Sequence, residues 1–173
     1  WDLHSLRRQI GFATQEAFLF SDSLANNVRF GDIEASTERV QSAAETAALS
    51  KDVSMFPDGF DTMVGERGIT LSGGQKQRTA MARALLIEPG IVILDDATSA
   101  VDTETEDQIN ERIKAVRGST TLIISHRVSS IREADIIVYL ENGRIVESGN
   151  HQALVALDGK YAELYRSQLL AME

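Results

Sequence analysis

The sequence predicts an α/β fold built on a mostly parallel sheet flanked by helices, and three observations predict it. Residues 91–94 form a continuous apolar stretch of the kind that is buried on both faces of a parallel sheet, and 120–125 predict a second buried strand. Helical patterns at 72–88 and 103–116 alternate with these strands. Strands that alternate with helices pair in parallel through right-handed crossovers, so we expect one sheet with helices packed on it.

The first half of the chain is predicted from local signals. A short strand is expected at 8–14 and a short helix at 22–30. The clearest helix covers 36–49, where Ser36 is a suitable N-cap. A turn-rich stretch covers 56–68.

The second half ends in a predicted hairpin and two helices. Asn142-Gly143 is a strong signal for a two-residue turn, and it predicts a hairpin over 135–148. Two helices are expected near 150–157 and 160–171.

Composition excludes several classes of protein. The 173 residues suffice for one domain with a sizeable core. The net charge of −9 argues against a nucleic-acid partner, and the absence of cysteine excludes disulfides and cysteine zinc sites. The longest apolar runs, such as 136–140, are far shorter than the roughly 20 residues that span a bilayer. The chain opens at Trp1 without an initiator Met, so we expect a piece of a longer protein.

The stretch LSGGQ, Leu71–Gln75, has two interpretations. Ser72 followed by Gln75 fits a capping box, which explains this pair without any ligand. However, Gly73 and Gly74 leave the first helical turn bare, so its N–H groups could approach a phosphate. A helix start does not need two glycines to fold, and each costs about 1 kcal/mol relative to Ala. The glycine pair therefore favours a phosphate site.

Polar residues follow three of the predicted strands. Asp95 and Asp96 end one strand, His126 follows its neighbour, and Gln15 follows the first. Ligands of open α/β sheets bind at the carboxyl ends of the strands. Asp95 would suit Mg²⁺, and Asp96 stands where a general base or a water-orienting carboxylate belongs. Each residue also has a plain structural alternative, as a strand end, a helix cap or a loop residue.

Four stretches together resemble the nucleotide-binding domain of an ABC transporter: GFATQEAFLF (11–20), LSGGQKQR (71–78), ILDDATSAVD (93–102) and ISHR (124–127). Two further stretches resemble the exporter branch, which includes multidrug and lipid exporters: VGERG (64–68) and GxIVExGxHxxL (143–154). The resemblance covers essentially the whole chain, in the same order and spacing.

The resemblance implies a P-loop NTPase-like sheet with an inserted helical subdomain at about 17–88, the remainder, 1–16 and 89–173, being part of the catalytic core. It implies ATP and Mg²⁺ as cofactors, and ATP hydrolysis coupled to export. The implied partners are a second nucleotide-binding domain and the coupling helices of a transmembrane domain, through which alone the chain would be held at the membrane. The implied location is the cytoplasmic face of a cell membrane, in style the bacterial inner membrane.

Roles carry over residue by residue. Asp95 is implied as the Mg²⁺ ligand, Gln15 as the residue that senses Mg²⁺ and water beside the transmembrane domain, and His126 as the switch histidine. The loop at 64–68 is implied to touch the coupling helices. Two sets are implied to act across the dimer: the signature Ser72, Gly73, Gly74 and Gln75, which completes the ATP site of the opposite subunit, and the D-loop, Ser99–Asp102.

The sequence departs from the family pattern by lacking GxxxxGK[ST], the phosphate-binding P-loop. The adenine-stacking aromatic, which lies further upstream in the family, is also missing. We therefore expect the chain by itself to bind ATP weakly or not at all and to be inactive as an ATPase. We also expect it to expose sheet edge and apolar face.

The second departure is Asp96, where the family usually has Glu. The shorter side chain withdraws the carboxylate by roughly 1 Å, a misplacement that can cost about a hundredfold in rate. This favours the weak-site half of a heterodimeric exporter, a regulatory half that holds ATP but hydrolyses little. The alternative is that the backbone shifts and Asp96 works as a slower base.

Overall fold

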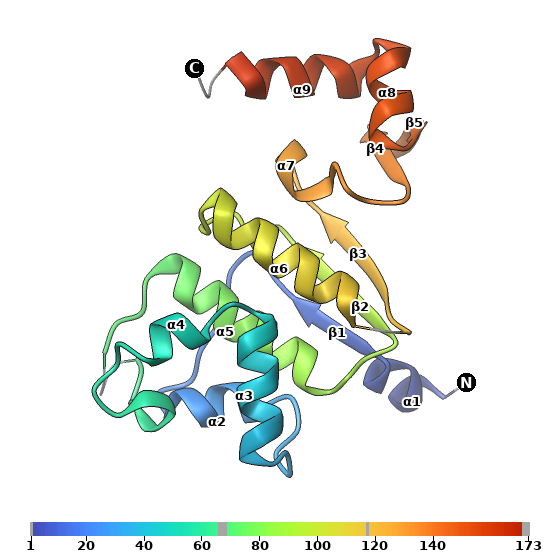
Figure 1. The fold of residues 1–173 in the computed structure, drawn as a ribbon. Coiled ribbons are helices and arrows are strands. Elements are labelled where there is room, and N and C mark those ends of the chain that lie inside the picture. The colour runs from blue at the N-terminus through green and yellow to red at the C-terminus, as the bar shows by residue number, and fades with distance from the viewer. Residues whose placement is uncertain (1, 66–68, 117, 171–173) are drawn as a thin grey trace. The chain divides into compact units, whose positions relative to one another are not determined.

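The computed structural model describes residues 2–65, 69–116 and 118–170 (Figure 1). The chain divides into two compact units, Trp1–Ile124 and Ser125–Glu173. Each unit has its own apolar core, so each is described separately.

The first unit is built on a parallel three-stranded sheet in the order β1-β2-β3. Its strands are β1 (Ile10–Ala13), β2 (Ile91–Asp95) and β3 (Thr120–Ile124). The predicted α/β class and the three strands are confirmed. Ala13 pairs with Leu94, and Asp95 pairs with Ile124, so the carboxyl ends of the strands lie level with one another.

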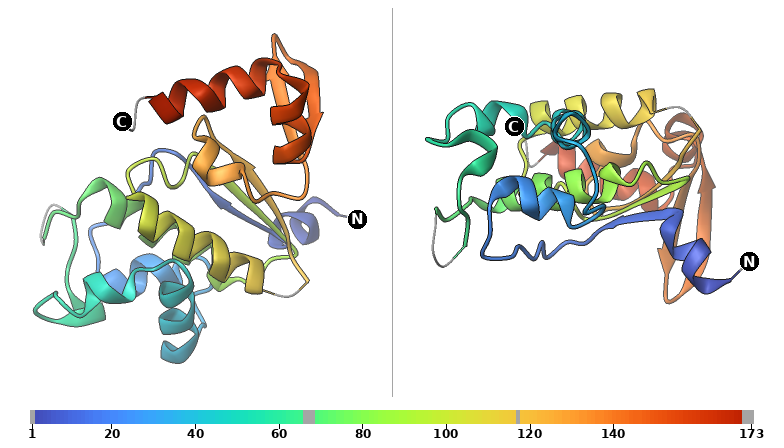
Figure 2. Two further views of the ribbon diagram at one scale, coloured as in Figure 1. Left: turned by 45° about the horizontal axis from the view of Figure 1, so that its top comes forward. Right: turned by 90° about the horizontal axis from the view of Figure 1, so that it is seen from below.

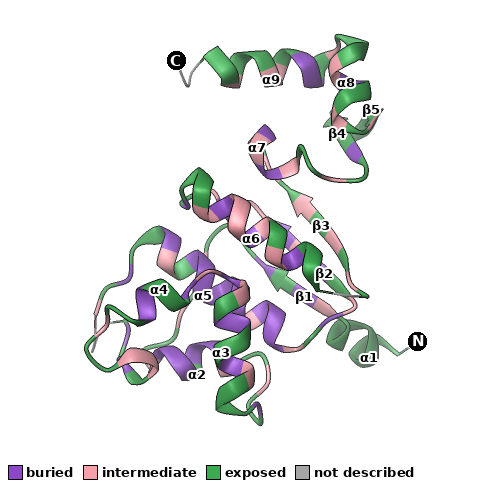
Figure 3. Ribbon diagram, viewed as in Figure 1, coloured by how far each residue is buried: buried purple, intermediate pink, exposed green. Residues whose placement is uncertain are grey.

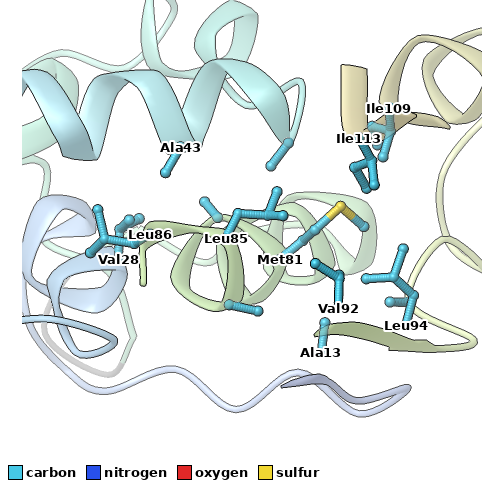
Figure 4. Close-up of a cluster of buried hydrophobic side chains, with 14 of the residues drawn as sticks. Ala13, Val28, Ala43, Met81, Leu85, Leu86, Val92, Leu94, Ile109 and Ile113 are labelled. Carbon is cyan, nitrogen blue, oxygen red and sulfur yellow. The ribbon is translucent and has the colours of Figure 1, made fainter. Parts of the chain in front are cut away.

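Two long helices cover one face of this sheet (Figures 1 and 2). These are α5 (Gly73–Leu86) and α6 (Thr103–Ala115), and both were predicted. Figure 4 shows Met81 of α5 between the isoleucines of α6 and two residues of β2, Val92 and Leu94. Full burial of such side chains stabilises a fold by about 1.5–3 kcal/mol each.

The shorter helices of the first unit lie before α5 in the chain. They are α1 (Leu3–Arg8), α2 (Leu24–Arg29), α3 (Thr37–Thr46), α4 (Ser50–Val53) and the 3₁₀ turn η1 (Gly59–Asp61). The predicted helices α2 and α3 are confirmed, with Ser23 and Ser36 as N-caps. The sequence did not predict α1, which buries none of its side chains and so has no apolar stripe to detect.

The expected burial of the strands on both faces is wrong for β2 and β3. The residues of β2 alternate between buried and more exposed positions, and those of β3 alternate between half-buried and exposed positions, because the described helices pack on one face of the sheet (Figure 3). The other face presents Phe12, Leu122 and Ile124, whose exposed fractions are 53%, 52% and 48%. The expected exposure of apolar sheet surface is therefore confirmed.

The second unit contains α7 (Val128–Ile131), an antiparallel hairpin of β4 (Ile137–Glu141) and β5 (Arg144–Gly149), and the helices α8 (His151–Leu157) and α9 (Lys160–Leu170). The predicted turn is confirmed, since Asn142 and Gly143 both have positive φ, at 50° and 73°. The core gathers Val128, Ile137, Leu154 and Tyr161. Across the described residues of both units, none of the helices has the length and apolar character of a membrane span.

Candidate functional site

The start of α5 confirms the capping-box prediction. The Ser72 hydroxyl accepts a hydrogen bond from the Gln75 backbone N–H at 3.3 Å, and Gln75 Oε1 accepts one from the Ser72 N–H at 2.9 Å. Ser72 and Gly73 are exposed, whereas Gly74 is buried. The capping interpretation and the phosphate interpretation are compatible, because the cap leaves Ser72 and Gly73 accessible.

An acidic residue that the sequence did not single out fixes this helix start from the side. Asp52 Oδ1 accepts a hydrogen bond from Gln75 Nε2 at 2.9 Å, and Asp52 Oδ2 pairs with Arg78 Nη2 at 2.6 Å. The side chains of Asp52 and Arg78 are 12% and 11% exposed, so the ion pair is largely removed from water. A lone Asp in a four-residue helix gives no sequence signal of this role.

The second glycine of LSGGQ has a packing reason. A Cβ atom at Gly74 would lie 2.8 Å from the backbone oxygen of Ala100, closer than any side chain tolerates. At Gly73 a Cβ would lie 3.2 Å from the Ala100 Cβ. The glycine pair therefore lets the loop after β2 approach the start of the helix. Of the two glycines, only Gly73 is exposed.

Asp95 and Asp96 lie at the carboxyl end of β2, as predicted. Both are half-buried, and Asp96 has φ +49°, in the left-handed region that non-glycine residues rarely adopt. The exposed Gln15, in the loop after β1, places Nε2 3.5 Å from Asp96 Oδ2, at the outer limit of a hydrogen bond. The structure thus brings together Gln15 and Asp96, which are 81 positions apart.

The loop after the two carboxylates leads directly into α6. The Ser99 N–H donates to the Asp96 backbone oxygen at 3.1 Å, which forms a turn. Asp102 is the N-cap of α6 and accepts from the Thr105 N–H at 2.9 Å. Hydrogen bonds from the Thr105 backbone and then from its side chain lower the pKa of Asp102 below its ordinary value.

His126 lies in the second unit, where it is exposed. Its backbone oxygen accepts a hydrogen bond from Gln168 Nε2 at 2.6 Å, and Gln168 Oε1 accepts from the Val128 N–H. Gln168 of α9 therefore holds the loop that carries His126. The role of this histidine toward the carboxylates stays a prediction.

Of the predicted coupling loop at 64–68, residues 66–68 lie outside the described residues. Three exposed aromatic rings that contact one another form a separate surface, which we call the aromatic surface: Phe18, Phe20 and Phe30. The Arg83 guanidinium lies 5.6 Å from the Phe20 ring centroid and 5.4 Å from that of Phe30. Arg83 also donates to the backbone oxygens of Phe18 and Asn27, which fixes the rings on the surface.

Residues 1–99, more than half of the chain, match the ABC transporter family. The chain belongs to the ABC transporter family. The ATP-dependent lipid A-core flippase of Legionella pneumophila (strain Paris) is 50% identical over 167 residues, which are 96% of this chain and 28% of the flippase. The human mitochondrial potassium channel ATP-binding subunit is 49% identical over 167 residues, 95% of this chain and 23% of that protein.

A solved ABC protein has the same fold. The structure of a bacterial Atm1-family ABC exporter with ATP bound superposes with a TM-score of 0.89 at 43% identity, and the match covers 95% of this chain and 29% of that one. The predicted family and fold class are confirmed. The chain spans less than a third of the length of each of these relatives.

Proposed function

We propose that this chain is part of the ATP-hydrolysing nucleotide-binding domain of an ABC exporter, with residues 17–88 forming its helical subdomain. The observation that carries the proposal is the grouping of Gln15, Asp95 and Asp96 at the carboxyl ends of parallel strands in a member of this family. The relatives named as a flippase and as an exporter support the export function.

The residues at the strand ends fit Mg²⁺ and the phosphates of ATP. Magnesium prefers carboxylate oxygens and retains several waters, so one or two half-buried carboxylates are a suitable protein contribution. Bound Mg²⁺ and ATP would supply the electrophilic phosphoryl group and neutralise its developing charge. Asp95 would hold the metal, Asp96 would orient the attacking water, and Gln15 would complete the polar surround of that water.

The start of α5 is suited to act on the ATP of a second nucleotide-binding domain. Ser72 and Gly73 are exposed, so an anion could approach the positive end of the helix at these two residues. Gln75 is held in place by Asp52, so it would need little ordering when a partner binds. Ser99 and Asp102 would lie at the same interface, and His126 would contact the terminal phosphate.

The aromatic surface supports contact with a transmembrane domain. Phe18 and Phe30 are 68% and 58% exposed, although side chains of this size are usually buried. The chain has no cysteine, so Phe18→Cys introduces a single thiol into it. In the assembled transporter this thiol should crosslink to a cysteine in a cytoplasmic loop of the transmembrane domain, whereas one introduced by Ala115→Cys at the exposed end of α6 should not. This contact would hold the chain at the cytoplasmic face of a bacterial inner membrane.

The central test is Asp96→Glu in the full-length transporter. If the missing methylene limits hydrolysis, ATP turnover should rise by up to about a hundredfold. The half-buried Asp107 of α6 provides a matched control, because Asp107→Glu makes the same change away from the strand ends. No increase, together with hydrolysis that still requires the partner's carboxylate, would instead favour a regulatory half that binds ATP without hydrolysing it.

The 173-residue chain by itself should bind Mg·ATP weakly or not at all, because the sequence contains no GK[ST] loop to cradle the phosphates. Calorimetry measures this directly. A clear micromolar affinity would contradict the expectation.

A further inference from the structure

The buried Gln77 of α5 contacts three chain segments of the candidate site. Its side chain lies in the second turn of the helix and Gln77 is only 6% exposed. Nε2 donates to Ser99 Oγ at 2.9 Å, and Oε1 accepts from the Ala100 N–H at 2.9 Å. Nε2 also lies 3.3 Å from the backbone oxygen of Gln15 and 3.4 Å from that of Asp96.

These contacts need both ends of an amide. Three oxygen atoms surround Nε2, so a carboxylate oxygen in its place would be repelled by their negative partial charges. The Ala100 N–H points at Oε1 and needs an acceptor there. An apolar side chain of the same size would remove the hydrogen bonds that these backbone and hydroxyl groups make to Gln77. The loss of such bonds in a buried setting destabilises the fold. Gln is the uncharged side chain that supplies donor and acceptor at this length.

The same contacts hold Asp96 in an unfavourable backbone conformation. Its φ of +49° is costly for a residue with a Cβ atom, and such strain persists only where the surroundings fix it. The Asp96 N–H donates to the Ile124 oxygen at 2.8 Å, and the Asp96 backbone oxygen accepts from Gln77 Nε2. The direction of the Asp96 carboxylate is therefore set from two sides, by β3 and by α5.

We propose that Gln77 is a positioning residue for ATP hydrolysis, which fixes the Gln15 loop, the Asp96 backbone and the Ser99-Ala100 turn relative to the helix that carries the signature. This inference rests on the proposed function. Any displacement of α5 moves all three segments together, because one amide joins them. Gln77 itself is buried beneath these groups and acts on the reaction only through them.

The test is Gln77→Met in the full-length transporter, compared with Thr79→Val. Thr79 is also fully buried on α5, but its hydroxyl donates to the Gln75 oxygen within the helix and reaches none of the three segments. Both variants remove a buried side-chain hydrogen bond, so both should lower the unfolding midpoint. Gln77→Met should in addition lower kcat by about 10- to 100-fold while KM for ATP changes less than about threefold. Thr79→Val should leave kcat within about twofold of the parent.

Gln77→Asn keeps the amide but shortens it, and it covers the case in which Gln77→Met does not fold. It should also lower kcat, with a smaller loss of thermal stability than Gln77→Met. Unchanged kcat in either folded Gln77 variant, or an equal loss in Thr79→Val, would overturn the inference. A parent transporter that hydrolyses no ATP would contradict the proposed function and leave the Gln77 inference aside. If the parent hydrolyses ATP slowly and Asp96→Glu raises its turnover, the Gln77 variants are compared in the Asp96→Glu transporter instead.

Discussion

The start of α5 and the end of β2 are the two polar regions of the candidate site, and they are built in opposite ways. At the start of α5, Ser72, Gln75, Asp52 and Arg78 bond to one another, so this region is complete within the chain. At the end of β2, Asp95 has no hydrogen bond to its carboxylate from the described residues, and the Gln15 contact to Asp96 is long. The first region is therefore fixed by contacts within the chain, whereas the Asp95 carboxylate of the second is not held by a hydrogen bond from the described residues.

This difference predicts that removing Asp52, which anchors the start of α5 from the side, acts on stability, whereas replacing a carboxylate at the end of β2 acts on turnover. The largest effect is expected for Asp52→Ala, which leaves the Arg78 charge buried without its partner. Breaking a buried pair in this way costs about 3–5 kcal/mol in the free energy of unfolding. Urea unfolding of the 173-residue chain, followed by circular dichroism, measures the loss. The control is Asp32→Ala, because the Arg39–Asp32 pair is far more exposed and should be worth about 0–1 kcal/mol. Equal losses of unfolding free energy in Asp52→Ala and Asp32→Ala would contradict the idea that the buried pair stabilises the fold more than the exposed one.

Asp95→Asn should have the converse effect. The fold should lose less than about 0.5 kcal/mol, because the side chain is partly exposed and the substitution is isosteric. ATP turnover of the full-length transporter should fall about 100- to 1,000-fold, since a neutral amide binds Mg²⁺ poorly. Added EDTA should abolish the turnover of the parent in the same assay. Turnover that survives in Asp95→Asn would place the metal ligand elsewhere.

Gly74→Ala probes the contact between the two regions. The new methyl group would overlap the Ala100 oxygen at 2.8 Å, and such overpacking costs about 1–3 kcal/mol. Gly73→Ala is the matched variant, since its methyl group would meet only the Ala100 Cβ, at 3.2 Å. Thermal unfolding of the two variants should show a larger loss for Gly74→Ala. A larger loss for Gly73→Ala would mean that the loop after β2 moves away from the new methyl group at Gly74 at little cost.

The smallest effect concerns the response of Asp102 to acid. Its pKa lies below the ordinary value of 3.8, so its contribution to stability is present above that pH and is lost as pH falls through the lower folded-state value. Asp102→Asn keeps an oxygen at the N-cap of α6 but does not titrate. The midpoint of thermal unfolding should therefore fall less between pH 5 and about pH 2.5 in Asp102→Asn than in the parent. Identical acid sensitivity would show that the charge contributes nothing to the cap.

Local patterns predicted much of the fold. The strands at β1, β2 and β3, the caps at Ser36 and Ser72 and the hairpin at Asn142-Gly143 follow from signals spread over a few residues. The helices α4 and α7 were missed because four residues are too few to show a helical period, and α1 was missed because it buries none of its side chains. The burial of β2 and β3 was overestimated, because an apolar strand does not reveal how many of its faces are covered.

The sequence by itself determined the family, the strand-then-carboxylate order at Asp95 and Asp96, and the capping box at Ser72 and Gln75. Only the tertiary structure showed that Asp52 holds Gln75 across 23 positions and that Gln77 joins Gln15 to Ser99 across 62 and 22. A cap is formed by neighbours in the chain, so its pattern is visible in a short window. A buried amide or carboxylate finds its partners only after the strands and helices have packed, and no local spacing records which distant backbone group will face it.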